Sequence, residues 1–316
     1  MAKKASMVLL VIFALLAALA NSVNSIANKM LVRPDGVAAL PAGLLLQVVS
    51  GGFTLAALLI FRPVFVWASW PYFAAVIVIS LAGFILISYG FAREDASAAG
   101  PIMGIKVLVT AVLESALQGH GVGLGVVLGA VLSVVALAFV SQGDVWSLRP
   151  RDMLRPGLLM MVLAAVSFGI CDMFVRQVII LFHGTGWVVS LYIVTFTAVV
   201  CIILLAFLAR RGGSFCGVSC AFDLNAVRRN FGTLASGGAA NVLTQVFLFS
   251  AFAIGGQITL TNILYNSRGL ILVILLAIMV LGHGHDVEKA RGRAYLYRLI
   301  GALLTIGAVA VALVVK

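Results

Sequence analysis

Long apolar runs alternate with short polar segments along the whole chain, and this pattern indicates the architecture. A helix needs about 20 mostly apolar residues to cross the hydrocarbon core of a bilayer. The centres of the runs that meet this requirement lie near Ala17, Val49, Ile79, Val107, Gly129, Ala165, Val194, Ala239, Leu270 and Leu304. The pattern therefore predicts an all-α membrane protein with ten transmembrane helices, five in each half.

The two halves resemble each other in sequence. The segment ALANSVNSIANKMLV of the first predicted span aligns with AVSFGICDMFVRQVI of the sixth, and Lys106 of the fourth aligns with Arg268 of the ninth. Because each unit has an odd number of spans, the second is inverted in the membrane relative to the first, as in many secondary transporters. We expect two inverted five-helix repeats, residues 1–146 with helices 1–5 and residues 147–316 with helices 6–10.

Composition excludes several classes of protein. Hydrophobic residues make up 63% of the 316 residues and charged residues only 10%, which leaves no room for a soluble domain. The net charge of +11 comes from short segments between apolar runs, where cations set membrane orientation rather than bind nucleic acid. We therefore expect the lipid bilayer as a partner, and no nucleic acid.

Motifs for catalysis and for metal binding are missing from the sequence. There is no H-E-x-x-H, phosphate loop or serine elbow, so we predict that the protein is not an enzyme and has no cofactor. Cys216 and Cys220 form a C-x3-C pair, and His283, His285 and Asp286 cluster in a connection. Neither group has the further ligands of a metal site, and we interpret both as polar loops.

The ninth predicted span, Gln257 to Leu281, places a fixed positive charge in the middle of a membrane-crossing segment. At ~100 degrees per residue, Gln257, Tyr265 and Arg268 fall on one face of the helix. A charge at that depth costs about 3 to more than 10 kcal/mol unless it faces water or a partner. Arg268 therefore indicates a substrate or ion site inside the bundle.

Positive charge exceeds negative charge within the predicted spans. The ionisable residues there are Lys29, Lys106, Arg176 and Arg268, against Glu114 and Asp172. Because a buried unpaired charge is strongly unfavourable, water or a bound anion should compensate the surplus. Arginine offers a planar fork for two oxygens of a phosphate or carboxylate, and lysine a mobile point charge. The sequence thus predicts a negatively charged substrate.

Some of these charges have structural alternatives. Asp172 and Arg176 are four residues apart, so we expect them to form an ion pair on one helix. Arg268 has the alternative of pairing with Glu114 or Asp172 across the bundle. Because Asp172 is expected to form an ion pair with Arg176, Glu114 is the better candidate for a proton-coupling carboxylate.

Asparagines repeat at helical spacing along one face of the first span. Asn21, Asn24 and Asn28 either line the transport pathway or join helices by hydrogen bonds, and the sequence leaves both interpretations open. Weaker candidates, which more often form bonds between helices, are Gln47, Ser50, Tyr192, Asn241 and Gln245.

Several of these residues resemble the motifs of a known family. Asn24 and Lys29 resemble the N-x4-K first-span signature of the EamA-type repeat in the drug/metabolite transporter superfamily, and Pro101 with Glu114 resembles its fourth-span pattern. The segment RLIGALLTIGAVAVAL resembles the glycine-rich last helix of the family. The resemblance implies a ten-helix transporter in the cell membrane, which in a bacterium is the inner membrane.

Within that superfamily, cations in the fourth and ninth helices are similar to the arrangement in the triose-phosphate and nucleotide-sugar branch. In triose-phosphate translocators, lysine and arginine at these helices hold the substrate phosphate. The resemblance implies that Lys106 and Arg268 clamp an anion here. The candidate substrate-binding residues are therefore Lys106, Arg268, Tyr265, Asn266, Asn24 and Asn28.

These patterns predict a secondary transporter that carries a small organic anion, with phosphorylated metabolites among the candidates, by alternating access. Two alternatives stay open, namely export of amino acids or drug-like metabolites and a flippase-type carrier for an anionic lipid headgroup. The arginine-rich connections place both termini outside, whereas the family resemblance places both inside. The sequence does not distinguish a monomer from a homodimer.

Overall fold

The computed structural model describes most of the chain in atomic detail. The described residues are 2–32, 37–94, 102–117, scattered positions between 124 and 139, 155–211, 214–215, 218–219, 224–255, 258–283 and 293–314. The predictions for most of the fifth span, and those for Cys216, Cys220, His285 and Asp286, lie outside these residues.

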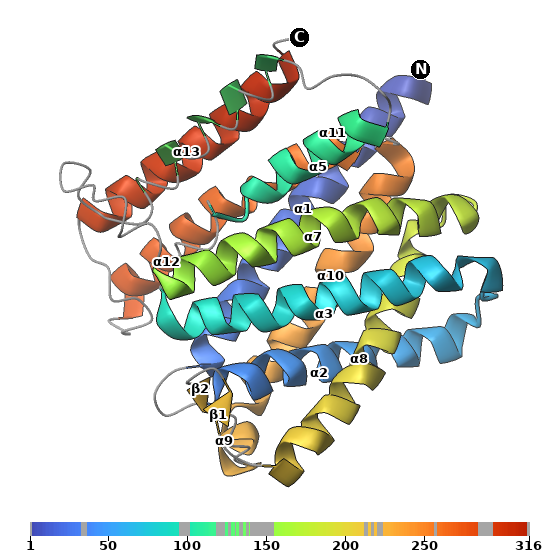
Figure 1. Cartoon of the computed structure of the whole chain (residues 1–316), viewed down its shortest axis with the longest axis vertical. Helices are drawn as coiled ribbons and strands as arrows, with labels where there is room; N and C mark the ends of the chain where they lie inside the picture. Colours follow the sequence, from blue (N-terminus) through green and yellow to red (C-terminus); the bar gives the residue numbers. More distant parts are fainter. Residues whose placement is uncertain are drawn as a thin grey trace.

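Nearly all of the described residues are helical, in agreement with the predicted fold class (Figure 1). The helices are α1 (Ala2–Leu31), α2 (Ala39–Phe61), the 3-10 turn η1 (Trp67–Ser69), α3 (Trp70–Arg93), α5 (Ile105–Leu117), α7 (Pro156–Leu181), α8 (Gly186–Arg211), α9 (Leu224–Arg229), α10 (Phe231–Gly255), α11 (Ile258–Tyr265), α12 (Arg268–His283) and α13 (Arg293–Val314). A small antiparallel hairpin, β1 (Ser214–Phe215) and β2 (Val218–Ser219), precedes α9.

Seven helical segments of the described chain are long and apolar enough to cross a membrane. They are Ser6–Leu31, Ala39–Phe61, Trp67–Arg93, Pro156–Leu181, Gly186–Arg210, Phe231–Ile254 and Ile258–Leu276. Of the other three predicted spans, two correspond to α5 and α13, and the fifth lies largely outside the described residues.

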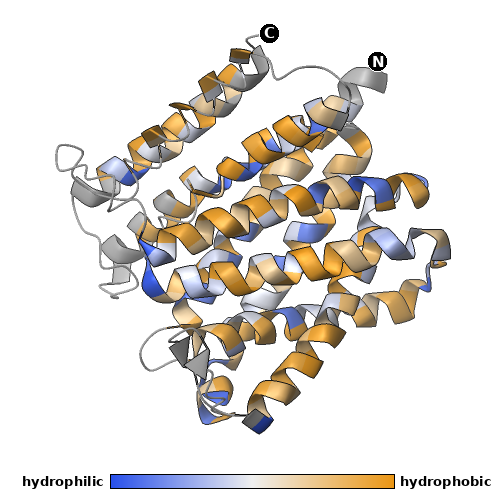
Figure 2. Ribbon diagram, in the orientation of Figure 1, coloured by the Kyte–Doolittle hydropathy of each residue, from blue (hydrophilic) through white to orange (hydrophobic). Residues whose placement is uncertain are grey.

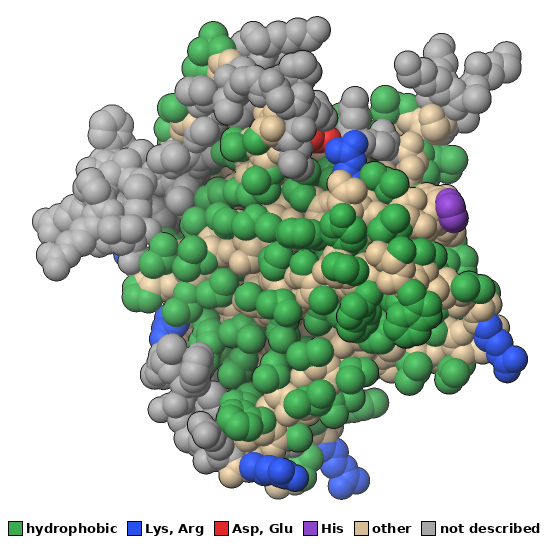
Figure 3. All heavy atoms as spheres, turned by 45° about the vertical axis from the view of Figure 1, so that its right-hand side comes forward, with side chains coloured by type: hydrophobic (Ala, Val, Ile, Leu, Met, Phe, Trp, Pro, Cys, Tyr) green, Lys and Arg blue, Asp and Glu red, His purple; other side chains and the backbone are tan. Residues whose placement is uncertain are grey.

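Hydrophobic residues make up most of the helices of the bundle (Figure 2), and many of their side chains lie on its outside. Leu59, Ile60 and Ile203 are 66%, 75% and 63% exposed. On the face drawn in Figure 3, hydrophobic side chains dominate, while Lys and Arg lie toward the edges. An exterior of this kind is stable against lipid and unfavourable in water. The chain is therefore a multi-pass membrane protein.

The three most extensive helix pairs each join one half of the chain to the other. They are α1 with α10, α2 with α8, and α3 with α7. In addition, α5 packs against α7, and both α11 and α12 pack against α1. The two halves are thus interleaved rather than separate, and a central space between them is bordered by helices from both.

The contact between α2 and α8 requires a glycine. A Cβ atom added at Gly51 would lie 2.1 Å from the Cβ of Ala198 on α8, whereas one at the next residue, Gly52, would meet nothing within 4 Å. We expect Gly51→Ala to lower the free energy of unfolding by about 1–3 kcal/mol, because the helices must move apart. Gly52→Ala is the matched control, and it should be neutral or stabilising because alanine favours helix.

Thermal unfolding of the two glycine variants, purified in the same detergent as the wild type, measures this difference. A Gly51→Ala protein that melts at the same temperature as Gly52→Ala would show that the close approach of α2 and α8 contributes nothing to stability.

An aromatic cluster fills the bundle at the end where α3 begins and α7 ends. We use this name for Phe65, Phe73, Phe182, Tyr192 and Phe196, whose ring centroids lie 5.1–6.5 Å apart in most of their pairs. Tyr192 Oη also donates a hydrogen bond to the backbone oxygen of Pro63, as expected for a residue that joins two segments. The aromatic cluster packs this end of the bundle tightly.

The ninth span is a single membrane-crossing segment, as predicted, but a two-residue turn interrupts its helix. The helix α11 ends at Tyr265, a turn forms at Asn266 and Ser267, and α12 begins at Arg268. The fourth span has a similar turn, since Met103 and Gly104 immediately precede α5. The helices α5 and α12 begin directly after these two turns. The first turn of α5 carries Lys106, and the first turn of α12 carries Arg268.

Candidate functional site

An open cavity lies between helices of both halves, with an empty volume of about 1070 Å³ that includes adjoining solvent. Amide side chains from α1, α2 and α10 line one part of it, and largely apolar side chains from α3 line another. The charged residues that line the cavity in the described part of the chain are Lys106 of α5, Asp172 of α7 and Arg268 of α12. The charges are thus concentrated on three helices.

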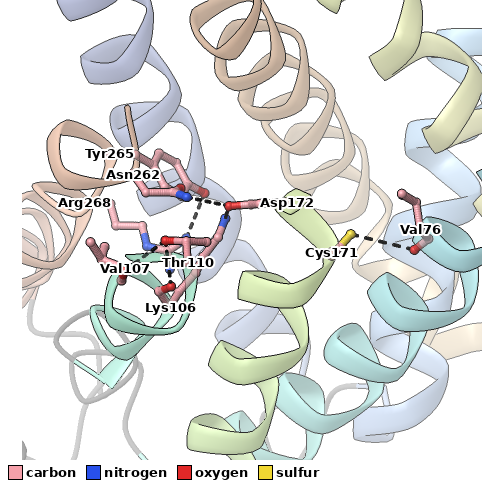
Figure 4. Close-up of polar contacts among 9 residues, drawn as sticks. All are labelled: Val76, Lys106, Val107, Thr110, Cys171, Asp172, Asn262, Tyr265 and Arg268. Atoms are coloured by element: carbon pink, nitrogen blue, oxygen red, sulfur yellow. Dashed lines mark hydrogen bonds and ion pairs between the residues drawn. The ribbon is translucent and has the colours of Figure 1, made fainter. Parts of the chain in front are cut away.

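Lys106 and Asp172 form a buried ion pair across the contact between α5 and α7 (Figure 4). Lys106 Nζ lies 2.8 Å from Asp172 Oδ2, and the two side chains are 6% and 5% exposed. Asn262 Nδ2 donates to the same carboxylate oxygen at 2.6 Å. Removing either partner of such a pair leaves an uncompensated buried charge.

Arg268 is also buried, with 6% of its surface exposed, but it has a different environment. Its Nη1 atom donates to the hydroxyl of Tyr265 at 2.8 Å, and its Cζ atom lies 4.5 Å from the centroid of the Tyr265 ring. Lys106 Nζ lies 5.4 Å from the same centroid, so one aromatic ring contacts both cations. Among the described residues, no carboxylate lies within ion-pair distance of Arg268.

Both cations sit in the first turn of a helix, where the helix dipole is positive. Arg268 is the first residue of α12 and Lys106 the second of α5. The start of α12 is attached to α1, because Ser22 Oγ donates to the backbone oxygen of Arg268 at 3.1 Å. Helix N-termini attract anions, so the backbone adds to the positive potential of the two side chains.

Comparison with known proteins supports a transport protein. Residues 8–142 match the EamA-like transporter family. We refer to residues 8–142 as the EamA-like domain. The members of this family, which lies in the drug/metabolite transporter superfamily, are transporters rather than enzymes. The EamA-like domain therefore implies a membrane transporter of small solutes.

The fold of the whole chain also has a solved counterpart. A structure described only as "Crystal structure of protein" aligns with a TM-score of 0.62 and 16% sequence identity. The alignment covers 96% of this chain and 99% of the other. At that identity the likeness concerns the fold alone, and it extends well beyond the EamA-like domain. No curated protein matches the chain.

The predicted ion pair between Asp172 and Arg176 was wrong. Asp172 pairs with Lys106, and Arg176 Nη1 instead lies 3.1 Å from Glu114 Oε1. The reason is that α5 packs against α7, so each charge on α7 meets an opposite charge on the neighbouring helix. Contacts between two packed helices override the weaker pairing between adjacent turns of one helix.

Glu114, the predicted coupling carboxylate, does not line the cavity. Besides Arg176 it accepts hydrogen bonds from the hydroxyl of Thr259 and, at 3.4 Å, from the backbone nitrogen of Thr259. The carboxylate that does line the cavity is Asp172. The structure therefore reverses the environments that the sequence predicted for the two carboxylates.

The asparagine stripe of the EamA-like domain faces the cavity. Asn21, Asn24 and Asn28 all line it, and the buried Oδ1 atoms of Asn24 and Asn28 have no hydrogen-bond partner among the described residues. Thr197 of α8 lines the cavity as well, and its hydroxyl is likewise unpartnered within that part of the chain. These groups form an uncharged polar wall of the cavity.

Other predicted polar residues connect helices. Asn241 Nδ2 donates to Gln47 Oε1 at 3.3 Å and to Ser50 Oγ at 3.0 Å, which joins α10 to α2. Both amides also line the cavity, together with Gln245. Asn266, a predicted substrate contact, is buried at the helix break and is not among the cavity-lining residues of the described chain.

Lys29, the last residue of the N-x4-K motif, connects α1 to the end of α3. Its Nζ atom donates to the backbone oxygens of Phe91 and Glu94, both at 2.7 Å, where α3 ends.

We expect Lys29→Met to lower the free energy of unfolding by about 1.5–3 kcal/mol, the usual contribution of hydrogen bonds from a charged donor. Denaturant titration of the purified protein measures the loss. Ligand affinity of the folded variant should be unchanged, and a selective loss of ligand affinity would contradict a structural role.

Sequence reasoning did not identify three residues that shape the site. Asn262 bonds to Asp172, Thr197 lines the cavity, and Ser22 holds the start of α12. Asn262 could have been recognised, because it lies three residues before Tyr265 and so on a neighbouring part of the same helix face. Thr197 and Ser22 carry no signal of this kind, since small hydroxyl residues are common in membrane helices.

Proposed function

We propose that the protein is a secondary transporter that carries a small organic anion by alternating access, with the anionic group of the cargo bound to Arg268. The observation that carries this proposal is the buried guanidinium of Arg268 in a cavity, without a carboxylate in contact among the described residues. A buried cation of this kind is costly unless something compensates it. A phosphate or carboxylate would do so and would accept two parallel hydrogen bonds from the guanidinium.

Charge balance in the cavity favours the same class of cargo. Lys106 and Asp172 neutralise each other in this conformation, so the three charged lining residues together carry one net positive charge. The adjacent N-termini of α5 and α12 add partial positive charge. A cationic substrate would be repelled by this group, and a neutral one would leave Arg268 uncompensated.

The polar wall supports a cargo that carries hydroxyl or amine hydrogens. The Oδ1 atoms of Asn24 and Asn28 are acceptors without donors among the described residues, and Thr197 lies in the same wall. Acceptors that line a cavity can bind the hydroxyl or amine hydrogens of a cargo. We therefore favour anions with several hydroxyl groups, such as sugar phosphates and hydroxycarboxylates, over purely aliphatic anions.

Alternating access requires two halves that can exchange roles, and the helix packing supports an inverted repeat. If the first five predicted spans are exchanged with the last five, the pair α1–α10 maps onto α7–α3, and α2–α8 maps onto itself. The contact of α5 with α7 maps in the same way onto that of α11 and α12 with α1. The breaks before Lys106 and Arg268 are related by the same exchange, and broken helices at matching positions are typical of transporter binding sites.

A ligand-stabilisation panel on the purified protein tests the proposal. The compounds are sugar phosphates, nucleotide sugars, di- and hydroxycarboxylates, amino acids, hydrophobic cations, and short-chain lipids with anionic headgroups. We expect the phosphates or hydroxycarboxylates to raise the melting temperature. A response confined to amino acids or hydrophobic cations would favour a metabolite or drug exporter. A response confined to the lipids would favour a lipid carrier. Either result would overturn the assignment.

A further inference from the structure

We propose that Asp172 is a proton-coupling site, which takes up one proton when a dianion binds between Lys106 and Arg268. This inference rests on the proposed function and adds the identity of the coupling ion. Its basis is the position of the Lys106–Asp172 pair inside the cavity, next to Arg268. In the observed conformation the ammonium group of Lys106 is paired with the carboxylate of Asp172. A second oxygen of the cargo would need the same ammonium group.

Charge balance gives the reason for the proton. The group of Lys106, Asp172 and Arg268 carries one net positive charge, so a monoanion neutralises it, whereas a dianion leaves a surplus negative charge. In a buried site such a surplus is strongly unfavourable. If one proton adds to Asp172, two cations face two negative charges, and the site with its dianion is neutral.

The proton also changes the contacts of Lys106. In the unliganded site the ammonium donates to Asp172 Oδ2, which Asn262 Nδ2 also contacts. The proton enters with the dianion from the aqueous mouth and adds to the carboxylate. The ion pair then breaks, and Lys106 turns its N–H groups to an oxygen of the dianion. The neutral carboxylic acid retains an oxygen that accepts from Asn262. On release of the dianion the proton leaves and the ion pair forms again.

Asp172 is surrounded by few other groups that could take this proton. Among the described residues, the titratable or charged groups around it are Cys171 and Arg176 on its own helix, Lys106 and Glu114 on α5, Tyr265 on α11 and Arg268 on α12. The side chains that α3, α8 and α10 contribute to the cavity are apolar or uncharged. Cys171 points to the backbone oxygen of Val76, with Sγ 3.8 Å away (Figure 4). Lys29 on α1 is bonded to backbone oxygens at the end of α3.

Glu114 provides the matched control. It is the second buried carboxylate of the described spans, it accepts from Arg176 and Thr259, and it lies outside the cavity lining. Because no ligand reaches its ion pair, we expect Glu114→Gln to leave both ligand binding and proton uptake unchanged. The comparison of Asp172→Asn with Glu114→Gln therefore separates a carboxylate in the site from a carboxylate in the scaffold.

The experiment measures proton uptake by the purified protein in weak buffer with a pH indicator, on addition of glycerol 3-phosphate or of malate. Between pH 7.5 and 8.5 a phosphate monoester is already a dianion, because its second pKa is about 6. We expect the wild type to take up about one proton per bound dianion, so that affinity falls about tenfold per pH unit as the pH rises. Asp172→Asn should bind without proton uptake and without pH dependence, and Glu114→Gln should behave as the wild type.

An infrared difference spectrum of the wild type provides a second measurement that does not depend on the Asp172 variant. Addition of glycerol 3-phosphate should produce the band of a protonated carboxyl group, and Glu114→Gln should retain that band. Binding without proton uptake would overturn the coupling site and leave the anion transporter intact. Loss of uptake in Glu114→Gln would overturn it in favour of Glu114. If neither dianion binds, the coupling site falls together with its dianionic cargo.

Discussion

Replacing Arg268 with glutamine should weaken the binding of anionic ligands by about 10- to 100-fold. This range follows from the 1.5–3 kcal/mol that hydrogen bonds to a charged group contribute, at about 1.4 kcal/mol per factor of ten. The guanidinium is the charged group of the cavity without an ion-pair partner among the described residues. The measurement is the dissociation constant of glycerol 3-phosphate or malate for the purified variant, by calorimetry.

Arg176→Gln is the control for Arg268→Gln. Arg176 also lies on a membrane-spanning helix, but it pairs with Glu114 and does not line the cavity. The Arg176→Gln protein should be less stable than the wild type, because Glu114 loses its ion-pair partner. Its affinity for anions should be unchanged. Equal affinity of the Arg268→Gln protein and the wild type would remove the basis of the proposed anion site.

Replacing Lys106 with glutamine should lower the free energy of unfolding by about 3–5 kcal/mol, the usual cost of breaking a buried ion pair from one side. The loss arises because Asp172 remains buried with a negative charge and only Asn262 as a hydrogen-bond donor. The double variant Lys106→Gln/Asp172→Asn should recover most of the stability, because neither charge remains. Denaturant titration of the single and double variants measures both effects.

A double variant that is no more stable than Lys106→Gln would mean that the pair is not an energetic unit. The same proteins separate stability from binding. In the double variant Arg268 is the remaining charge of the three, so anion affinity should lie between those of the wild type and Arg268→Gln. Lys106→Gln on its own is an unsuitable test of the cargo, because it also leaves the buried carboxylate of Asp172 without its ion-pair partner.

The sequence was sufficient to predict most of the described helices and part of the cavity lining, namely Lys106, Arg268, Tyr265, Asn24 and Asn28. Membrane-spanning segments follow from length and hydropathy, which are local properties. The helical period predicted that Tyr265 and Arg268 share one face of a helix. The alignment of the two halves predicted that Lys106 and Arg268 occupy equivalent positions in the two repeats. In the structure both cations contact the ring of Tyr265. Whether these residues bind substrate is still a prediction.

The partners of the charges could not be predicted, because contacts between helices determine them. The spacing of Asp172 and Arg176 on α7 indicated a local pair, but the packing of α5 against α7 supplies each with a closer partner. The N-x4-K motif likewise did not indicate that Lys29 bonds to backbone oxygens at the end of α3. Such a contact depends on how far two packed helices are shifted along their axes relative to each other.

The break in the ninth span also had no clear signal in the sequence. Asn266 and Ser267 form the turn without a proline or glycine between α11 and α12. Neighbouring helices stabilise a turn at this depth, because Ser22 of α1 bonds to the backbone oxygen of Arg268. Helix interruptions in membrane proteins are tolerated where neighbouring groups satisfy the freed backbone, and a single sequence does not show those neighbours.

The charged residues of the cavity belong to α5, α7 and α12, while the amides of its polar wall belong to α1, α2 and α10. Under the proposed function, the charge of the cargo and its hydroxyl groups are recognised by separate sets of helices. Substitutions in the polar wall can alter which carbon skeleton fits without changing how many negative charges the site accepts. A scaffold divided in this way can acquire new substrates of the same valence by stepwise mutation, with the proposed coupling carboxylate left in place.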